Sequence, residues 1–214
     1  MIDIQQQEEM LIAIGNILSK KLQVYAIGGT AMMLKGIKNA TLDIDLVFNK
    51  KTDREEFMNA LKKLGAKESD VTIVYGLKNN TPLMLKFNNC RFDMFMNKII
   101  TSNFSDAMKE RAKQTHEFGN LIVKVADSND LLIMKSVTSR EKDIDDIVTI
   151  SNKSRINWEV ILEEAKEQVR LGNETAILGL GKKLEKLINQ KLISVPKPIT
   201  DALWKLFKEQ VKKK

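Results

Sequence analysis

Residues 41–48 read Thr-Leu-Asp-Ile-Asp-Leu-Val-Phe, and this stretch carries the clearest signal in the chain. Polar and apolar residues alternate at its start, which predicts a β-strand with one polar face. Asp43 and Asp45 are two residues apart, so both carboxylates leave the same face of that strand. Two such charges repel each other unless a cation lies between them, and their oxygens suit Mg²⁺ or Mn²⁺. The alternative is an exposed face of an edge strand.

A third acid occurs in similar surroundings. Asp93 lies among large apolar residues in Arg-Phe-Asp-Met-Phe, residues 91–95, which also reads as a strand. If this strand neighbours the first, three carboxylates converge on one place. Such a cluster can hold two metal ions, one at the attacking oxygen and one at the phosphates of a nucleotide. We therefore predict a metal site of Asp43, Asp45 and Asp93, with Asp93 as the ligand nearest the nucleophile.

A glycine turn precedes the acids by about thirteen residues. Gly28, Gly29 and Thr30 lie between a short apolar strand, residues 24–27, and a predicted helix over residues 31–35. Glycines let the backbone approach a phosphate closely, and free N–H groups at a helix start favour an anion. The Thr30 hydroxyl can add a donor. Alone, this tripeptide is more often an ordinary turn, but its place before the acids favours a phosphate-binding role.

The order of elements predicts a mixed α/β or α+β chain, with a small mixed sheet flanked by helices and a helical lobe after it. We expect a catalytic domain over residues 1–152 and a basic helical lobe over residues 153–214. The expected strands are 24–27, 42–48, 71–75, 83–87, 90–96 and 121–125. The expected helices are 5–22, 31–35, 54–64 behind Asp53, 104–115, 128–140, 142–150, 157–171, 174–190 and 200–211.

Charge is distributed unevenly over the 214 residues, whose formal net charge is +7. Residues 151–214 contain 14 Lys and Arg against 8 Asp and Glu, and end in three lysines. A basic lobe beside a nearly neutral body favours a polyanionic partner such as RNA. A solvated, lysine-rich helical surface explains the same charges.

Little in the sequence points to export or to a membrane. The N-terminus lacks the basic start and apolar run of a signal peptide, and no apolar run reaches about 18 residues. Cys90 is the only cysteine, so an internal disulfide cannot form. We therefore expect a cytoplasmic protein with no membrane partner. We interpret Cys90 as a small core residue and His116 as a surface residue.

Together, the glycine turn, the Asp43-Ile44-Asp45 strand and Asp93 resemble the signature of the nucleotidyltransferase (polymerase-β-like) superfamily. That signature is a Gly-Gly/Ser turn, a strand of alternating apolar residues and acids, and a third acid on a nearby strand. The resemblance covers roughly residues 20–150. It implies the nucleotidyltransferase fold, Mg²⁺ or Mn²⁺ as cofactor, and a nucleoside triphosphate such as ATP as substrate.

A second block is similar to the AbiEii/MenT-type toxins and their bacterial and archaeal relatives. It comprises Asp130 to Lys135 and the run from Arg140 to Asp146. The resemblance implies that Lys135 and Arg140 meet the triphosphate and that Asp146 supports catalysis or substrate placement. It also implies RNA, such as tRNA, as acceptor and a cognate antitoxin as partner. The alternative for this block is a charged surface helix.

We therefore expect a metal-dependent enzyme that transfers a nucleoside monophosphate from a nucleoside triphosphate to an acceptor hydroxyl. RNA is the favoured acceptor because of the basic lobe. One alternative is a non-catalytic nucleotide- or RNA-binding module of a toxin–antitoxin-like pair. Another is a small-molecule transferase of the aminoglycoside type. A third is a structural protein whose acids pair with lysines.

Overall fold

The fold is that of a computed structural model, which describes residues 1–138, 140 and 142–211. The terminal lysines 212–214 and Glu141 of the second block lie outside the described residues. The chain forms two compact units. The first comprises Met1–Ile100 and Met108–Ala126, and the second comprises Thr101–Ala107 with the described part of the chain from Asp127 onwards.

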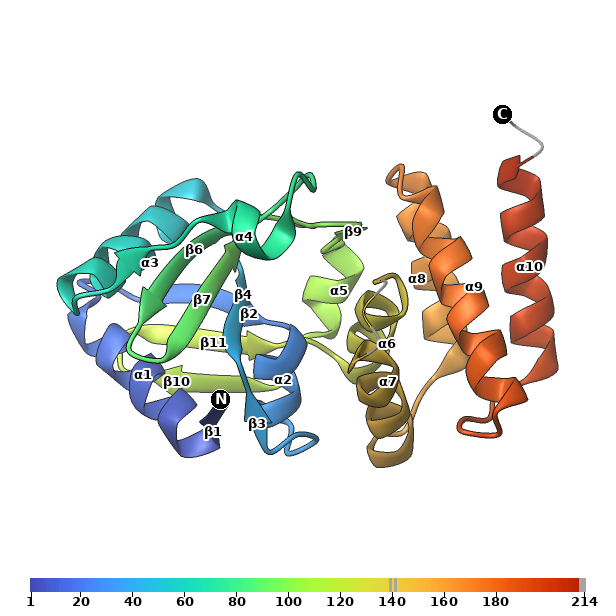
Figure 1. The fold of residues 1–214 in the computed structure, drawn as a ribbon, viewed down its shortest axis with the longest axis horizontal. Coiled ribbons are helices and arrows are strands. Elements are labelled where there is room, and N and C mark those ends of the chain that lie inside the picture. The colour runs from blue at the N-terminus through green and yellow to red at the C-terminus, as the bar shows by residue number, and fades with distance from the viewer. Residues whose placement is uncertain (139, 141, 212–214) are drawn as a thin grey trace. The chain divides into compact units, whose positions relative to one another are not determined.

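The first unit is built on a mixed β-sheet (Figure 1). The sheet has the strand order β10-β11-β2-β4-β7-β6-β5. Its strands are β2 (Leu22–Ala26), β4 (Asp43–Val47), β5 (Lys67–Glu68), β6 (Leu83–Phe87), β7 (Cys90–Phe95), β10 (Thr115–Phe118) and β11 (Leu121–Val125). Short strands β1 (Ile2–Asp3) and β3 (Ala40–Thr41) pair separately, and β8 spans Lys98–Ile99. The helices are α1 (Ile4–Ile17), α2 (Gly28–Leu34), α3 (Lys51–Lys63) and α4 (Val71–Tyr75).

The acid-bearing strand β4 lies in the middle of this sheet. It pairs antiparallel with β2 and parallel with β7. One face of β4 and β7 belongs to the core, where Ile44 and Phe92 are paired in register and fully buried. The ring of Phe57 on α3 lies 6.3 Å from that of Phe92, centroid to centroid. Because side chains alternate along a strand, the core residues leave the opposite face for the acids.

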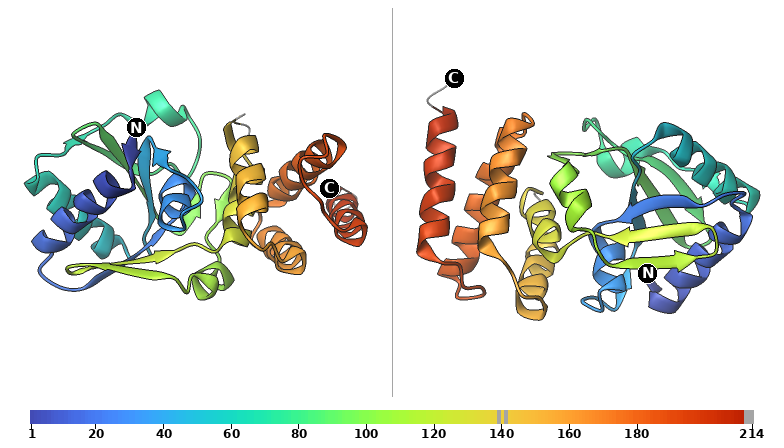
Figure 2. Two further views of the ribbon diagram at one scale, coloured as in Figure 1. Left: turned by 90° about the horizontal axis from the view of Figure 1, so that it is seen from below. Right: turned by 180° about the vertical axis from the view of Figure 1, so that it is seen from behind.

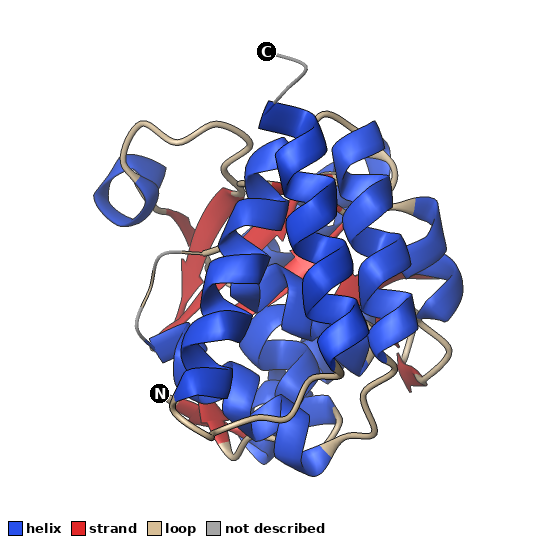
Figure 3. Ribbon diagram, turned by 90° about the vertical axis from the view of Figure 1, so that its right-hand side faces the viewer, coloured by secondary structure: helices blue, strands red, loops and turns tan. Residues whose placement is uncertain are grey.

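The second unit is almost entirely helical (Figure 3). It contains β9 (Ser102–Asn103), α6 (Ser128–Ser136), α7 (Lys142–Lys153), α8 (Trp158–Arg170), α9 (Glu174–Asn189) and α10 (Lys197–Val211). Helix α5 (Asp106–Arg111) begins in this unit and continues into the first. Helices α8, α9 and α10 lie side by side (Figures 1 and 3) and bury Ile161, Leu187 and Leu203. Within the described residues, no helix is both long and apolar enough to cross a membrane.

The predicted fold class is confirmed: a mixed sheet flanked by helices is followed by helices alone. The hairpin between β6 and β7 is also confirmed, and Asn88 in its turn has a φ of 53°. The division into a catalytic domain of residues 1–152 and a lobe of residues 153–214 stays a prediction. The compact units divide the chain differently, since α6 and α7 belong to the second unit.

Two predicted elements were wrong. Residues 71–75 form helix α4 instead of a strand, because the Asp70 side chain accepts a hydrogen bond from Thr72 N and caps the turn. This local cap outweighs the strand preference of Val-Thr-Ile-Val-Tyr. The predicted helix over residues 104–115 ends at Arg111, and residues 115–118 form β10. Pairing with β11 stabilises β10 as the outer strand of a hairpin, yellow-green in Figure 2.

Several element boundaries also differ from the prediction. Helix α2 begins at Gly28 instead of residue 31, so the glycine pair belongs to its first turn. Helix α3 begins at Lys51, which places Asp53 inside the first turn instead of at the cap. Helix α10 begins at Lys197, and Pro198 lies in its first turn, where a missing N–H costs nothing.

Candidate metal and nucleotide site

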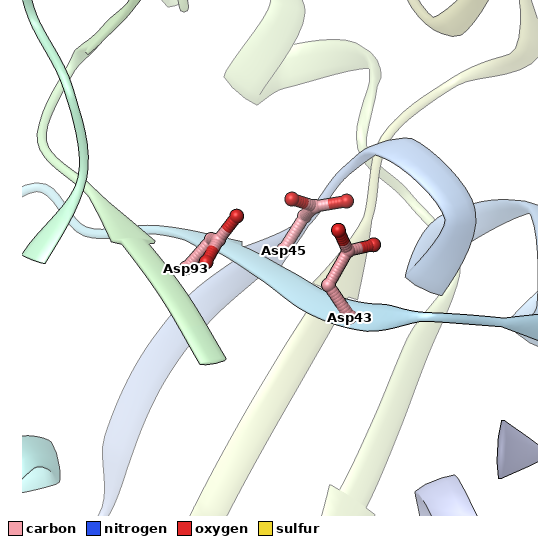
Figure 4. A group of neighbouring side chains, drawn as sticks. All are labelled: Asp43, Asp45 and Asp93. Atoms are coloured by element: carbon pink, nitrogen blue, oxygen red, sulfur yellow. The ribbon is translucent and has the colours of Figure 1, made fainter. Parts of the chain in front are cut away.

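The three predicted acids come together on one face of the sheet. The parallel register of β4 and β7 places Asp45 beside Asp93 and Asp43 beside Arg91. One carboxylate oxygen from each of Asp43, Asp45 and Asp93 lies within 4.8 Å of the others. Figure 4 shows the three side chains gathered over the same side of the two strands. Within the part of the chain that the structure describes, no other group of His, Cys, Asp and Glu meets this criterion.

The donor set fits a divalent metal ion. All three donors are hard carboxylate oxygens, the ligand type that Mg²⁺ and Mn²⁺ prefer. Oxygens bound to one Mg²⁺ lie at most about 4.2 Å apart, because each Mg–O bond is about 2.1 Å. The observed 4.8 Å therefore requires only small side-chain rotations to bring the oxygens around one ion. The residues that would hold such an ion are Asp43, Asp45 and Asp93.

Two residues that sequence reasoning did not select complete the cluster. Arg91 donates from Nε to Asp93 Oδ1 at 2.6 Å, and its Nη2 donates to both Asp93 Oδ2 and Asp43 Oδ2. The Tyr75 hydroxyl, from helix α4, donates to Asp93 Oδ2 at 2.5 Å. Arg91 is two residues before Asp93, so strand periodicity alone would have placed it on the acid face. Tyr75 carried no such signal, because residues 71–75 were predicted to form a strand.

Electrostatics in the cluster follow from burial and pairing. Asp93 is fully buried, and burial raises its pKa above the ordinary value despite hydrogen bonds from Arg91 and Tyr75. Burial, with the charges of Asp45 and Asp93, also raises the pKa of Tyr75. Burial alone would lower the pKa of Arg91, but its bonds to Asp93 and the charge of Asp43 raise it instead. Tyr75 is therefore a neutral donor and Arg91 a fixed cation at neutral pH.

The glycine turn lies directly against the acid strand. Gly28 has a φ of 55°, and a Cβ at this position would lie 2.3 Å from Asp45 Oδ2. A Cβ on Gly29 would lie 2.3 Å from Thr41 Oγ1. Both distances are shorter than any real contact of a Cβ atom. A side chain at either glycine would force the Asp45 carboxylate or the Thr41 hydroxyl to move, and the bare backbone of the pair borders the carboxylate cluster.

Thr30 connects the turn to the strand. Its hydroxyl accepts a hydrogen bond from Asp45 N at 2.8 Å and donates to Asp43 O at 3.5 Å. The residue is fully buried. Its side chain thus holds the backbone that carries both acids, whereas the sequence suggested a hydroxyl directed at a phosphate.

Lys135, Arg140 and Asp146, the residues predicted from the second block, lie together in the second unit. Lys135 Nζ lies 2.9 Å from Asp143 Oδ1 and 2.7 Å from Asp146 Oδ2. Arg140 Nε lies 2.9 Å from Asp143 Oδ2, and the Thr138 hydroxyl donates to Asp143 as well. Lys135, Arg140 and Asp146 are therefore joined through one network, in which Asp143 is the central acid.

This network is largely removed from water. Only 9% of the Lys135 side chain is exposed, whereas 47% of the Arg140 side chain is exposed. Burial alone would raise the pKa of Asp143, but Lys135, Thr138 and Arg140 lower it to about 2. Burial likewise opposes the charge on Lys135, but Asp143 and Asp146 raise the pKa of this lysine. The network joins α6 to α7 by buried ion pairs.

Cys90 and His116 were interpreted from the sequence as residues without a catalytic role. Cys90 is buried, and burial together with Asp43, Asp45 and Asp93 raises the pKa of its thiol to about 12. His116 lies in β10, where its ring stacks on that of Phe118 at a centroid distance of 6.1 Å.

Similarity to known proteins is found at the level of a sequence family. The sequence profile of a family described as "Nucleotidyltransferase of unknown function (DUF6036)" matches residues 4–179. Among solved structures, the chain is similar to ANT(2″)-Ia in complex with adenylyl-2″-tobramycin, with 14% identity, a TM-score of 0.49, and coverage of 84% of this chain and 98% of that one. It is also similar to an antigenic nucleotidyltransferase-like protein from Paracoccidioides brasiliensis, with 14% identity, a TM-score of 0.49 and 94% coverage of both chains. No curated protein matched the chain.

Proposed function

The chain belongs to the nucleotidyltransferase family that matches residues 4–179, and from this premise we propose that it is a metal-dependent enzyme. The proposed reaction transfers a nucleoside monophosphate from a nucleoside triphosphate to an acceptor hydroxyl. The observation that carries this proposal is the convergence of Asp43, Asp45 and Asp93 from two neighbouring strands, with oxygens within 4.8 Å of one another. A cluster of three carboxylates beside a bare glycine backbone suits a metal-bound triphosphate.

Asp43, Asp45 and Asp93 would hold Mg²⁺ or Mn²⁺, which supplies positive charge to the triphosphate. The backbone of Gly28 lies against the Asp45 carboxylate, so phosphates on an ion held by Asp45 would lie near the glycine turn. The acceptor oxygen forms a bond to the α-phosphorus, the bond from that phosphorus to the bridging oxygen breaks, and pyrophosphate leaves. The hydroxyl proton passes to Asp93, the acid predicted nearest the nucleophile. Rate enhancement comes from positioning and from charge neutralisation.

Metal and nucleotide binding test this site directly. We expect the wild type to bind Mn²⁺ and a nucleoside triphosphate, and Asp43→Asn/Asp45→Asn to lose both. Asp145→Asn/Asp201→Asn is a matched control, because it makes the same charge change at two exposed residues. Retention of metal and nucleotide affinity in the Asp43→Asn/Asp45→Asn protein would refute the proposal.

RNA is the acceptor that the charge distribution favours. Lys182, Lys186, Lys205 and Lys208 on α9 and α10 are all exposed. Phosphate contacts by such lysines make RNA affinity fall steeply with salt, by about tenfold or more between ~50 and ~200 mM. Incubation with each α-labelled nucleoside triphosphate, total RNA and Mg²⁺ should label the RNA. Label found only in a small molecule such as an aminoglycoside, or in protein, would exclude RNA as the acceptor.

The second network is proposed to act on the triphosphate through Arg140. Its side chain is about half exposed, whereas Lys135 is buried between Asp143 and Asp146. Lys135 and Asp146 would then contribute by placing the Arg140 segment. Arg140→Gln should raise KM for the nucleotide and leave kcat nearly unchanged, since the lost contact is made equally in the ground and transition states. An unchanged KM would remove Arg140 from the nucleotide site.

A toxin role is a finer prediction that rests on the resemblance of this block to AbiEii/MenT-type proteins. If modification of tRNA inactivates translation, expression of the chain should arrest growth, and Asp43→Asn/Asp45→Asn should abolish the arrest. A cognate antitoxin would restore growth in the presence of the wild-type chain. Normal growth with an active, labelling enzyme would exclude the toxin role while leaving nucleotidyl transfer intact.

A further inference from the structure

Arg91 occupies a fixed position among the acids. In the parallel register of β4 and β7 it lies directly beside Asp43, and on its own strand it is two residues before Asp93. Both relations place its side chain on the acid face of the sheet. The backbone therefore brings one permanent cation to the carboxylate cluster, whatever the side chain contacts at a given moment.

The guanidinium contacts the same groups that would hold a metal ion. Its Nη2 donates to Oδ2 of Asp43 and to Oδ2 of Asp93, which come from different strands. Its Nε donates to the second oxygen of Asp93, so that carboxylate is held by both nitrogens. A planar, always-charged group is well suited to this arrangement. Arg91 thus bridges two of the three proposed metal ligands.

The charge balance explains why a cation belongs there. Asp43, Asp45 and Asp93 would bring three negative charges together, and Asp93 is fully buried. Burying an unpaired carboxylate is strongly destabilising. A divalent ion and Arg91 each meet this need, and Arg91 already contacts both oxygens of Asp93 and Oδ2 of Asp43. An ion held by these carboxylates must therefore share them with Arg91 or displace it.

We propose that Arg91 is a resident counter-cation that competes with the divalent ion for Asp43 and Asp93, and so sets the metal concentration at which the site loads. The inference rests on the proposed metal site. When the ion binds, Arg91 releases these oxygens and turns away from them. The competition lowers metal affinity and stabilises the fold when no metal is bound.

Tyr75 supports the metal-free arrangement. Its hydroxyl holds Asp93 Oδ2, its ring lies 6.0 Å from the Arg91 Cζ, and the same ring packs edge-on against Phe95. Helix α4, which carries Tyr75, contains no buried residue, and Ile73 is 82% exposed. Tyr75 is therefore an anchor of a lightly attached helix. Its release with Arg91 would couple metal binding to movement of α4.

Mn²⁺ titration followed by electron paramagnetic resonance, combined with thermal unfolding, tests the competition without measuring activity. Arg91→Gln should bind Mn²⁺ at least about tenfold more tightly than the wild type, because a nearby unit charge is removed. Its metal-free form should melt at a lower temperature, and Mn²⁺ should raise its Tm by more than that of the wild type. Arg91→Lys, which keeps the charge but loses the planar two-nitrogen contact with Asp93, should have intermediate affinity and retain the fold.

The control is Arg170→Gln, which removes the same charge from an exposed pair with Glu167. It should leave Mn²⁺ affinity unchanged. Equal or weaker Mn²⁺ binding by both Arg91 variants, with a wild type that does bind Mn²⁺, overturns the competition and leaves the proposed function standing. Absence of Mn²⁺ binding by the wild type and by every variant overturns both. If Arg91→Gln folds only with Mn²⁺, that result and a tighter Kd for Arg91→Lys support the proposal.

Discussion

Alanine at position 28 would disturb the site at one defined point. Its Cβ would lie 2.3 Å from Asp45 Oδ2 and 3.1 Å from Asp45 Cγ. The Asp45 carboxylate must therefore rotate away, at a cost of about 0.5–1.5 kcal/mol for a side chain forced off its preferred rotamer. The φ of 55° adds about 1–2 kcal/mol, because an L residue with a Cβ is strained there.

The sum is a loss of about 1.5–3.5 kcal/mol in the free energy of unfolding. For a chain of this size, 1 kcal/mol corresponds to roughly 2–4 °C, so we expect Tm to fall by about 3–14 °C. Mn²⁺ affinity should fall by about 10–100-fold, the usual effect of displacing a group that orients a metal ligand. Differential scanning calorimetry and Mn²⁺ titration measure the two quantities.

Gly36→Ala is the matched control. Gly36 has a φ of 69°, but no neighbouring atom lies within 4 Å of the place where its Cβ would be, so alanine meets only the backbone strain. The Tm of Gly36→Ala should fall by less than that of Gly28→Ala, because only the backbone strain contributes. Its Mn²⁺ affinity should equal that of the wild type. If Gly28→Ala and Gly36→Ala have the same Mn²⁺ affinity, the contact between the glycine turn and Asp45 does not shape the metal site.

Other residues give shorter tests. Thr30→Val removes the buried acceptor of Asp45 N, so it should lower the free energy of unfolding in urea by about 1–3 kcal/mol, and Thr30→Ser should restore it. Lys135→Met leaves Asp143 buried without its lysine, which should cost about 3–5 kcal/mol in the same assay. The pKa of Asp143 is lowered to about 2, so its pairing stabilises the fold above pH ~4 and that stability is lost as the pH falls through the folded-state pKa. Asp143→Asn should flatten this part of the stability–pH curve by about 1–2 kcal/mol, allowing for solvent screening, and an unchanged curve would contradict the assignment. The buried Cys90 thiol, with a pKa of about 12, should react with a thiol reagent near neutral pH only after unfolding.

The acid-bearing strands were predicted well from the sequence, because the alternation of polar and apolar residues indicates directly which side chains share a face of a strand. Along their strands, Asp43, Asp45 and Asp93 alternate with apolar residues that belong in a core. The shared face of the first two acids followed from this alternation alone. What alternation could not reveal was which strands are neighbours. The parallel register of β4 and β7 depends on packing between segments almost fifty residues apart.

The prediction failed where a local contact opposes the pattern. Val-Thr-Ile-Val-Tyr, residues 71–75, favours a strand, but the Asp70 cap turns it into helix α4 and brings Tyr75 to Asp93. The direction of the Thr30 hydroxyl was equally hidden, because a side chain that could meet a phosphate can also hold a strand backbone. Lys135 was selected as a phosphate contact, but its eight-residue separation from Asp143 gave no sign of their buried ion pair.

Crystals grown with Mn²⁺ and a non-hydrolysable nucleoside triphosphate analogue offer the most direct test of the site. An anomalous difference map locates the metal without assumptions about activity. We predict a peak coordinated by Asp43, Asp45 and Asp93, with Arg91 turned away from Asp43 and the phosphates beside Gly28. A well-ordered analogue with no anomalous peak among these three carboxylates would contradict the proposed site.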